Sequence, residues 1–149
     1  MNDDPIDAIE APRKLTRLIG HREAAQGFIA AWKSGRMPHA WLIGGPKGIG
    51  KASFAWACAR YALAEGTSDT LEISDARVAR QVAAGSHPGI RLVRRSPSPN
   101  STTGKLREEI AVEDIRGLQP FFRQTAPHWR VAVIDAADDM SSSAANALL

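Results

Sequence analysis

The sequence predicts an α/β fold in which a parallel β-sheet is flanked by helices. Three short, largely apolar segments, 40–43, 90–93 and 130–134, are candidate strands. The first, 40–43, shows no alternation with polar residues, which is typical of a strand buried on both faces of a parallel sheet. Segments with helical periodicity lie between these runs, so strands and helices alternate along the chain. A glycine-rich turn follows the first run directly. This order of elements favours a parallel sheet.

Four segments carry the apolar spacing or the boundary residues of helices. In the first, apolar residues recur at i, i+3, i+4 and i+7 from Ala25. In the third, Asp75 stands near the expected start and Gly85 just past the expected end. The expected helices are 21–34, 51–64, 75–84 and 112–122, the last of them bent by Pro120. A Ser-Pro-rich stretch, 96–103, closed by Gly104, predicts an exposed loop.

The segment 45–51, Gly-Pro-Lys-Gly-Ile-Gly-Lys, matches the pattern G-x-x-x-x-G-K between a predicted strand and a predicted helix. In this pattern, called a P-loop, glycines let successive backbone N–H groups point at a phosphate, and the helix N-terminus adds partial positive charge. Lys51 would reach the β and γ phosphates. The alternative is an ordinary tight turn. The lysine and the flanking elements favour the phosphate site.

Two groups that nucleotide hydrolysis needs are missing. Ala52 stands where a hydroxyl would ligate Mg²⁺, and Ser53 lies about 100° further round the helix. Asp135, which follows the third predicted strand, is a candidate to hold the ion through water. Its alternative role is a cap for the next segment. Ala136 follows it where an active ATPase commonly carries a glutamate.

Several segments carry a family resemblance, most specifically the ending Ala-Ala-Asn-Ala-Leu-Leu at 144–149. The segments concerned are 18–21, 38–43, 84–89, 112–116, 130–140 and 143–149. On these residues the chain, from about residue 13 onward, resembles bacterial clamp-loader subunits of the AAA+ family.

The resemblance implies an AAA+, RecA-like P-loop domain. Residues 13–149 would form its N-terminal portion, preceded by a flexible leader, 1–12, with the lid and collar domains absent from this chain. AAA+ sheets have the strand order 5-1-4-3-2, so the first and third predicted strands would need a fourth between them. We therefore expect exposed strand edges, and pairing or aggregation when these residues are expressed alone.

The resemblance also implies a function and partners. The expected role is that of a non-motor (stator) subunit of the DNA polymerase III clamp loader, which supports ATP-dependent loading of the sliding clamp onto primed DNA. The expected partners are the tau/gamma and delta subunits, with primed DNA and the clamp contacted indirectly through the complex. The protein would be a weak or inactive ATPase within the polymerase holoenzyme. The alternatives are an active P-loop ATPase and a vestigial P-loop that binds nothing.

Site residues follow from the motif and the resemblance together. The residues expected to bind ATP weakly are Gly45, Gly48, Gly50, Lys51, Ser53 and Asp135 around the phosphates and magnesium, and Leu18 and Ile19 near the adenine. The resemblance places the whole segment from Leu18 to His21 near the adenine. Packing in the core is an equal alternative for Leu18 and Ile19. We assign no catalytic residue. Clamp-loader subunits often carry a four-cysteine zinc module, but the corresponding stretch, 63–86, has no cysteine, so no zinc is expected.

Composition excludes further classes of protein. The 149 residues contain 19 Lys and Arg against 16 Asp and Glu, no apolar run long enough for a membrane span, and an acidic N-terminus unlike a signal peptide. We therefore expect a cytoplasmic protein. The only cysteine, Cys58, is expected to be a buried small hydrophobe. The densest basic stretch, Arg91 to Arg107, is interpreted as a solvated strand end and loop, with a phosphate-tracking patch as the alternative.

Overall fold

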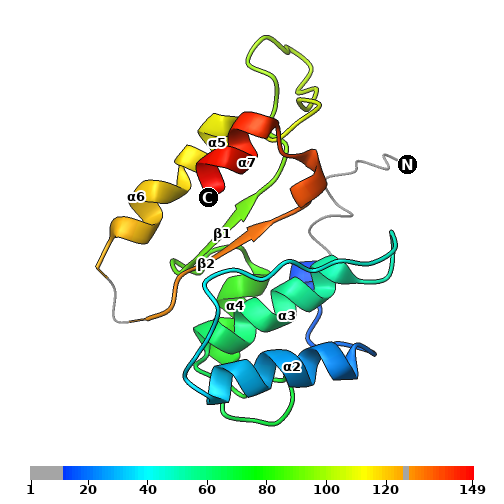
Figure 1. The fold of residues 1–149 in the computed structure, drawn as a ribbon, viewed down its shortest axis with the longest axis vertical. Helices are drawn as coiled ribbons and strands as arrows, with labels where there is room; N and C mark the ends of the chain where they lie inside the picture. The colour runs from blue at the N-terminus through cyan, green and yellow to red at the C-terminus, as the bar shows by residue number, and fades with distance from the viewer. Residues whose placement is uncertain (1–11, 126–127) are drawn as a thin grey trace. The chain divides into compact units, whose positions relative to one another are not determined.

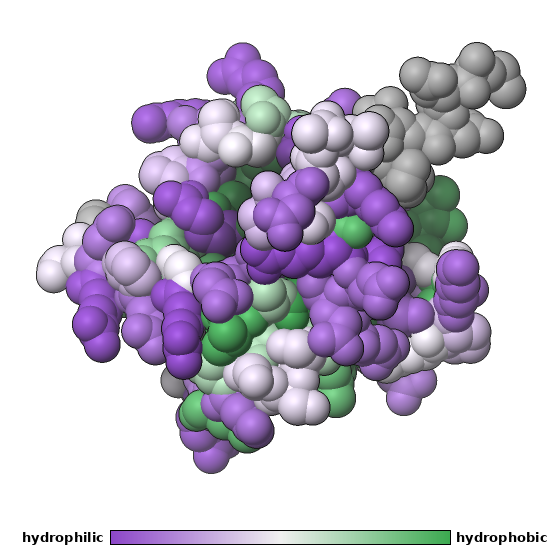
Figure 2. All heavy atoms as spheres, turned by 90° about the horizontal axis from the view of Figure 1, so that it is seen from above, coloured by the Kyte–Doolittle hydropathy of each residue, from purple (hydrophilic) through white to green (hydrophobic). Residues whose placement is uncertain are grey.

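The computed structural model of the protein describes residues 12–125 and 128–149 (Figure 1). The chain divides into two compact units, Met1–Pro88 and Gly89–Leu149. The predicted leader, 1–12, lies outside the described residues except for Pro12. Within the described residues, no helix has the length and apolar character needed to cross a membrane. Hydrophilic residues dominate the face shown in Figure 2, where hydrophobic residues form separate patches.

The first unit contains three helices where the sequence predicts them. They are α2 (Arg22–Lys33), α3 (Lys51–Leu63) and α4 (Ala76–Ala83). The Asp75 carboxylate caps α4 by accepting from the backbone N–H groups of Arg77 and Val78, at 2.9 and 3.0 Å. Gly85, just past the end of α4, has a φ of 70°, a backbone conformation that favours glycine. Both predicted boundary residues of this helix are therefore confirmed.

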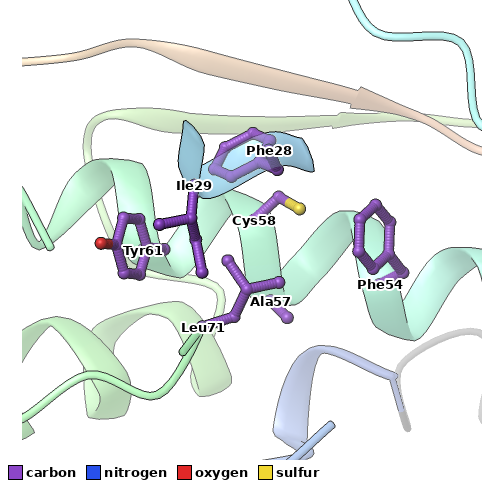
Figure 3. Close-up of a cluster of buried hydrophobic side chains, with 7 residues drawn as sticks. All are labelled: Phe28, Ile29, Phe54, Ala57, Cys58, Tyr61 and Leu71. Carbon is purple, nitrogen blue, oxygen red and sulfur yellow. The ribbon is translucent and has the colours of Figure 1, made fainter. Parts of the chain in front are cut away.

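The core of the first unit lies between α2 and α3 (Figure 3). Its buried residues are Phe28 and Ile29 from α2, Phe54, Ala57, Cys58 and Tyr61 from α3, and Leu71 from the following loop. The Tyr61 hydroxyl donates to the carbonyl oxygen of Ser68 at 2.7 Å, and the Trp32 indole N–H to that of Gly66 at 3.0 Å. These two bonds hold the loop after α3 against the core. Cys58 is buried, as the sequence predicts.

The predicted strand at 40–43 is not formed, so this prediction was wrong. The Trp41 ring packs on Phe28 at 5.3 Å between centroids and Ile43 packs against the core, but Leu42 between them is 89% exposed. A strand requires a hydrogen-bonded neighbour. The described residues pair no strand with this segment. It therefore runs over the core with Trp41 and Ile43 in contact with it, partly exposed, and Leu42 open to solvent.

The second unit is built on a two-stranded parallel sheet. Its strands are β1 (Ile90–Val93) and β2 (Val131–Ile134), in the register Ile90↔Val131 to Val93↔Ile134. Both predicted strands and their parallel direction are confirmed, and the fold class is mixed α/β. The larger sheet implied by the resemblance stays a prediction, because the sheet of the described residues has only these two strands.

Short helices cover one face of this sheet. They are α5 (Val112–Arg116), α6 (Leu118–Arg123) and α7 (Ser142–Leu148), with a 3₁₀ turn η1 (Ala137–Asp139) before α7. Figure 1 shows α5 and α7 side by side, and these two helices share many contacts. The helices and the sheet share one cluster of buried residues, which is made of Val93, Ile110, Ile115, Leu118, Phe121 and Ala144.

The predicted helix 112–122 is interrupted at Gly117, and Pro120 explains this interruption. Proline lacks the N–H that would bond to the carbonyl of Arg116, and its ring crowds that carbonyl. The break therefore falls about one turn before the proline, and Pro120 lies in the first turn of α6, where its missing N–H has no intrahelical partner to lose. The interruption is therefore the effect that the sequence predicts from Pro120.

The predicted loop at 96–104 is confirmed as a hairpin-like excursion. The Ser98 N–H donates to the Lys105 carbonyl and the Arg107 N–H to the Ser96 carbonyl, both at 2.9 Å. A single antiparallel bridge joins Pro97 and Leu106. The tip between these contacts is mostly exposed.

Candidate nucleotide-binding site

The glycine loop, defined here as residues 44–50, leads directly into α3. Gly48 and Gly50 have φ values of 83° and 98°, a region that side chains rarely adopt. Gly50 is the N-cap of α3, and no side chain caps the helix there. The first N–H groups of α3 are therefore available to an anion, which the positive end of the helix dipole would attract.

Lys51 folds back over this loop. Its Nζ atom donates to the carbonyl oxygens of Gly45 at 2.6 Å and Pro46 at 2.9 Å. The ammonium group thus lies against the loop backbone, close to the positions where the motif would place phosphate oxygens. The predicted contributors Gly45, Gly48, Gly50 and Lys51 all belong to one local structure.

His21 also contacts the loop. The resemblance places the segment 18–21 near the adenine, but it does not specify this contact. Its Nε2 atom lies 2.8 Å from the carbonyl oxygen of Ile49. Its ring meets that of Phe54 edge to face, with 6.2 Å between centroids. A Cβ atom added to Gly50 would lie 3.3 Å from Nε2, so glycine at this position gives the imidazole room. The one local feature associated with this contact is the Gly20-His21 turn before α2, in which both residues have a positive φ.

The two residues predicted to lie near the adenine differ in environment. Leu18 is half-buried and packs against the α2–α3 core, which supports the packing alternative for this residue. Ile19 is 87% exposed. Contact of either residue with a nucleotide base stays a prediction.

The cation ligands expected beside a nucleotide are incomplete in the first turn of α3. Ala52 has no hydroxyl to offer, and Ser53 follows one position further round the helix; both are half-buried. The donor set of this loop therefore fits a phosphate group better than it fits a hydrated Mg²⁺ ion. Within the part of the chain that the structure describes, no three His, Cys, Asp or Glu residues gather as metal ligands would.

Asp135 belongs to the second unit. It directly follows β2, its N–H donates to the carbonyl oxygen of Val93 at 2.9 Å, and Ala136 comes next. It therefore stands at the carboxyl end of a parallel strand, where α/β proteins bind ligands. Because the glycine loop lies in the other unit, the meeting of Asp135 with Lys51 around one nucleotide stays a prediction.

The basic stretch that begins at Arg91 does not form one patch. Arg95 makes an ion pair with Asp139, at 3.4 Å from Nε to the carboxylate. The Nη1 atom of Arg94 is buried. Arg91 instead lies over the ring of Phe121, at 4.8 Å from its centroid. Three neighbouring arginines therefore have three different environments.

The second unit also has an open hollow of about 600 Å³. It is lined by the hairpin-like loop and the starts of α5 and α7, including Lys105, Glu109, Glu113 and Ser143. None of its lining residues is a predicted site residue. Its mixed charge does not indicate a nucleotide.

Comparison with known proteins identifies the family. Residues 20–149 match the family described as DNA polymerase III, delta subunit. The chain belongs to this family, so the resemblance to clamp-loader subunits is confirmed at the family level.

Individual relatives are consistent with this assignment. The chain is 32% identical to the DNA polymerase III subunit delta' of Bacillus subtilis over 117 residues, 76% of this chain and 32% of the relative. It is 30% identical to the delta' subunit of Pseudomonas aeruginosa over 113 residues, 74% and 32% of the two chains. It is 29% identical to the replication factor C small subunit of Methanocella arvoryzae over 138 residues, 92% and 34%. The chain thus spans about a third of the length of these relatives.

Proposed function

We propose that the protein acts as a non-motor, or stator, subunit of the DNA polymerase III clamp loader. In this role it supports ATP-dependent loading of the sliding clamp onto primed DNA. The observation that carries the proposal is a pair of alanines in a chain of this family: Ala52 after the lysine of the glycine loop and Ala136 after Asp135. Both stand where a motor subunit needs groups that act on Mg²⁺ and water.

The glycine loop supports weak nucleotide binding within this role. Gly48 and Gly50 have the backbone conformation needed for N–H groups to face a phosphate, and Lys51 supplies the positive charge. Ser53 and Asp135 would assist a magnesium ion only indirectly, Asp135 through water. Bound ATP would contribute charge to the site, and the protein's residues would hold its phosphates without hydrolysing it.

The proposed partners follow from the same assignment. The tau/gamma and delta subunits would surround this chain, and primed DNA and the clamp would be reached through the complex. The domain would be of the AAA+ class, with residues 13–149 as its N-terminal portion. Two relatives are named as delta' subunits of DNA polymerase III, which supports membership in a complex of several subunits.

An active P-loop ATPase is the second candidate, and the complete G-x-x-x-x-G-K pattern at the start of α3 favours it. ATP turnover by the full-length protein without partners separates the two candidates, with Lys51→Ala as the control. We expect no turnover above that of Lys51→Ala. Substantial turnover that Lys51→Ala abolishes would reject the stator role and support the ATPase.

Assembly is the direct test of the proposed role. The tagged full-length protein is co-expressed with the tau/gamma and delta subunits of the same source and analysed by size-exclusion chromatography. We expect one complex that contains all three kinds of subunit. Elution of the protein apart from tau/gamma and delta, when those two still associate, would overturn the proposal.

A further inference from the structure

Arg91 and Arg130 come together at the start of the sheet in the second unit. Arg91 is the second residue of β1, and Arg130 immediately precedes β2. The register pairs Arg91 with Ala132, two residues after Arg130, so the two arginines lie diagonally on one face of the sheet. Both guanidinium groups lie over the Phe121 ring of α6, with their Cζ atoms 4.8 and 5.1 Å from its centroid.

These two cations have little else to neutralise them. The Arg91 Nη1 atom donates to its neighbouring carbonyl, that of Ile90, at 2.9 Å. The Nε atom of Arg130 is buried without a hydrogen-bond partner. Neither guanidinium has a carboxylate within 4 Å among residues 12–125 and 128–149. The two guanidinium groups repel each other because both are positively charged. An anion bound by both of them would replace this repulsion with attraction.

The local sequence keeps acidic residues away from this pair. No Asp or Glu occurs between Asp75 and Glu108, or between Asp114 and Asp135. The first interval contains β1, and the second contains α6 and β2. The carboxylates of the second unit are therefore confined to 108–114 and 135–139. This segregation favours a polyanion over a single small anion.

The residue after Phe121 in α6 carries an exposed aromatic ring. Phe122 is 50% exposed and meets the buried Phe121 edge to face, with 5.0 Å between centroids. Proteins that bind single strands combine cations that contact phosphates with aromatic rings on which bases stack. Arg91 and Arg130, which contact Phe121, would supply the cations, and the adjoining Phe122 ring would supply the stacking surface.

We propose that Arg91, Arg130 and Phe122 form a contact site for single-stranded nucleic acid. The guanidinium groups bind phosphodiester oxygens, and a base stacks on Phe122. This site lies within the second unit and involves none of the glycine loop. The inference goes beyond the stator role and does not depend on it.

The test measures binding of a fluorescent oligodeoxythymidylate to the full chain by anisotropy, over a series of salt concentrations. Removing two phosphate contacts with Arg91→Gln/Arg130→Gln should weaken binding about tenfold and reduce the salt slope by about 1.4. Arg77→Gln/Arg80→Gln, on the exposed face of α4, removes the same charge and serves as the matched control. We expect the control to change neither quantity measurably.

Phe122→Ala tests the aromatic contact separately. Loss of one stacked base should weaken binding about fivefold or more while leaving the salt slope unchanged. Duplex DNA of the same length should bind more weakly than the single strand because its bases are not free to stack. Equal binding of the duplex would overturn the single-strand assignment.

Photo-cross-linking of the wild-type chain keeps the proposal testable if a variant fails to fold. A strand that contains iododeoxyuridine should cross-link to the peptide that carries Phe122. The proposal is overturned if the wild-type chain does not bind the strand at low salt, or if the α4 control weakens binding equally. Binding of polyglutamate without binding of the strand would also overturn it, in favour of an acidic protein partner.

Discussion

The Nε2 atom of His21 lies 2.8 Å from the carbonyl oxygen of Ile49, so a side chain at the start of α2 is bonded to the glycine loop before α3. Because a carbonyl oxygen only accepts, Nε2 must carry the proton in this contact. His21 holds this position with a φ of 53°, in the left-handed region. The hydrogen bond and the unusual backbone conformation of His21 therefore occur together.

Substitution of His21 should separate the two effects. His21→Ala removes the hydrogen bond and keeps the unfavourable backbone conformation, so we expect the free energy of unfolding to fall by about 1 kcal/mol. His21→Gly loses the same bond but adopts the left-handed region freely, so it should cost less. Urea denaturation of both variants measures the difference. Equal destabilisation by the two would show that the backbone conformation contributes nothing.

Two glycine-to-alanine substitutions should change the stability of the protein in opposite directions. Gly48 has a φ of 83° and open space where a Cβ would lie, so Gly48→Ala should lower stability by about 1 to 2 kcal/mol through backbone strain alone. Gly27 lies within α2 and also has open space around it, so Gly27→Ala should raise stability by about 0.5 to 1 kcal/mol. Thermal unfolding of both variants tests this. A loss of stability in Gly27→Ala would contradict the explanation.

Cys58 should be unreactive in the native protein. Burial raises the pKa of its thiol to about 12, so native Cys58 is protonated at neutral pH and hidden from reagents. A disulfide reagent should modify it only at the rate at which the protein unfolds. Rapid modification at pH 8 without denaturant would show that the α2–α3 core opens readily.

The same shift predicts how stability depends on pH. The unfolded thiol, with its ordinary pKa of 9.0, loses its proton before the folded thiol does. The contribution of the neutral buried thiol is therefore complete below pH 9 and is lost as the pH rises toward 12. Lysine and tyrosine also titrate in this range, so the measured quantity is the difference between the wild-type protein and Cys58→Ala. A difference independent of pH would contradict the prediction.

A hydroxyl restored at position 52 should improve nucleotide binding only in the presence of magnesium. Ala52→Thr places an oxygen directly after Lys51, where P-loop proteins ligate the ion. We expect the affinity for ATP to rise about tenfold, equivalent to about 1.4 kcal/mol. Equilibrium titration with Mg²⁺, repeated in EDTA, measures this. An increase that persists in EDTA would mean that the new hydroxyl does not act through the cation.

Local signals in the sequence predicted much of the fold. Asp75 and Gly85 mark the ends of α4 because capping depends on residues within a few positions of each other. The segments that form β1 and β2 were recognisable because each is short and mainly apolar, and in the structure they pair with each other. The run at 40–43 looks the same in sequence. Whether it forms a strand depends on a neighbouring strand, which the run itself does not encode.

The candidate site was predictable only in part. The glycine loop is a contiguous pattern, so its residues could be named in advance. The contact of His21 with Ile49 depends on how α2 packs beside α3. Arg91 and Arg130 are far apart in the sequence. That both lie over the Phe121 ring depends on the strand register and on the position of Phe121. Contacts of this kind become visible only once the tertiary structure is known.

The Lys51 ammonium group already donates to the carbonyl oxygens of Gly45 and Pro46. An incoming phosphate would therefore have to compete with these two oxygens for the ammonium group. These acceptors are tethered to the lysine, so their effective concentration is high and never falls on dilution. An incoming phosphate gains only the difference between the bonds it forms and the bonds it displaces. We therefore expect that, if the proposed phosphate site is correct, a triphosphate gains more from this exchange than a monophosphate does.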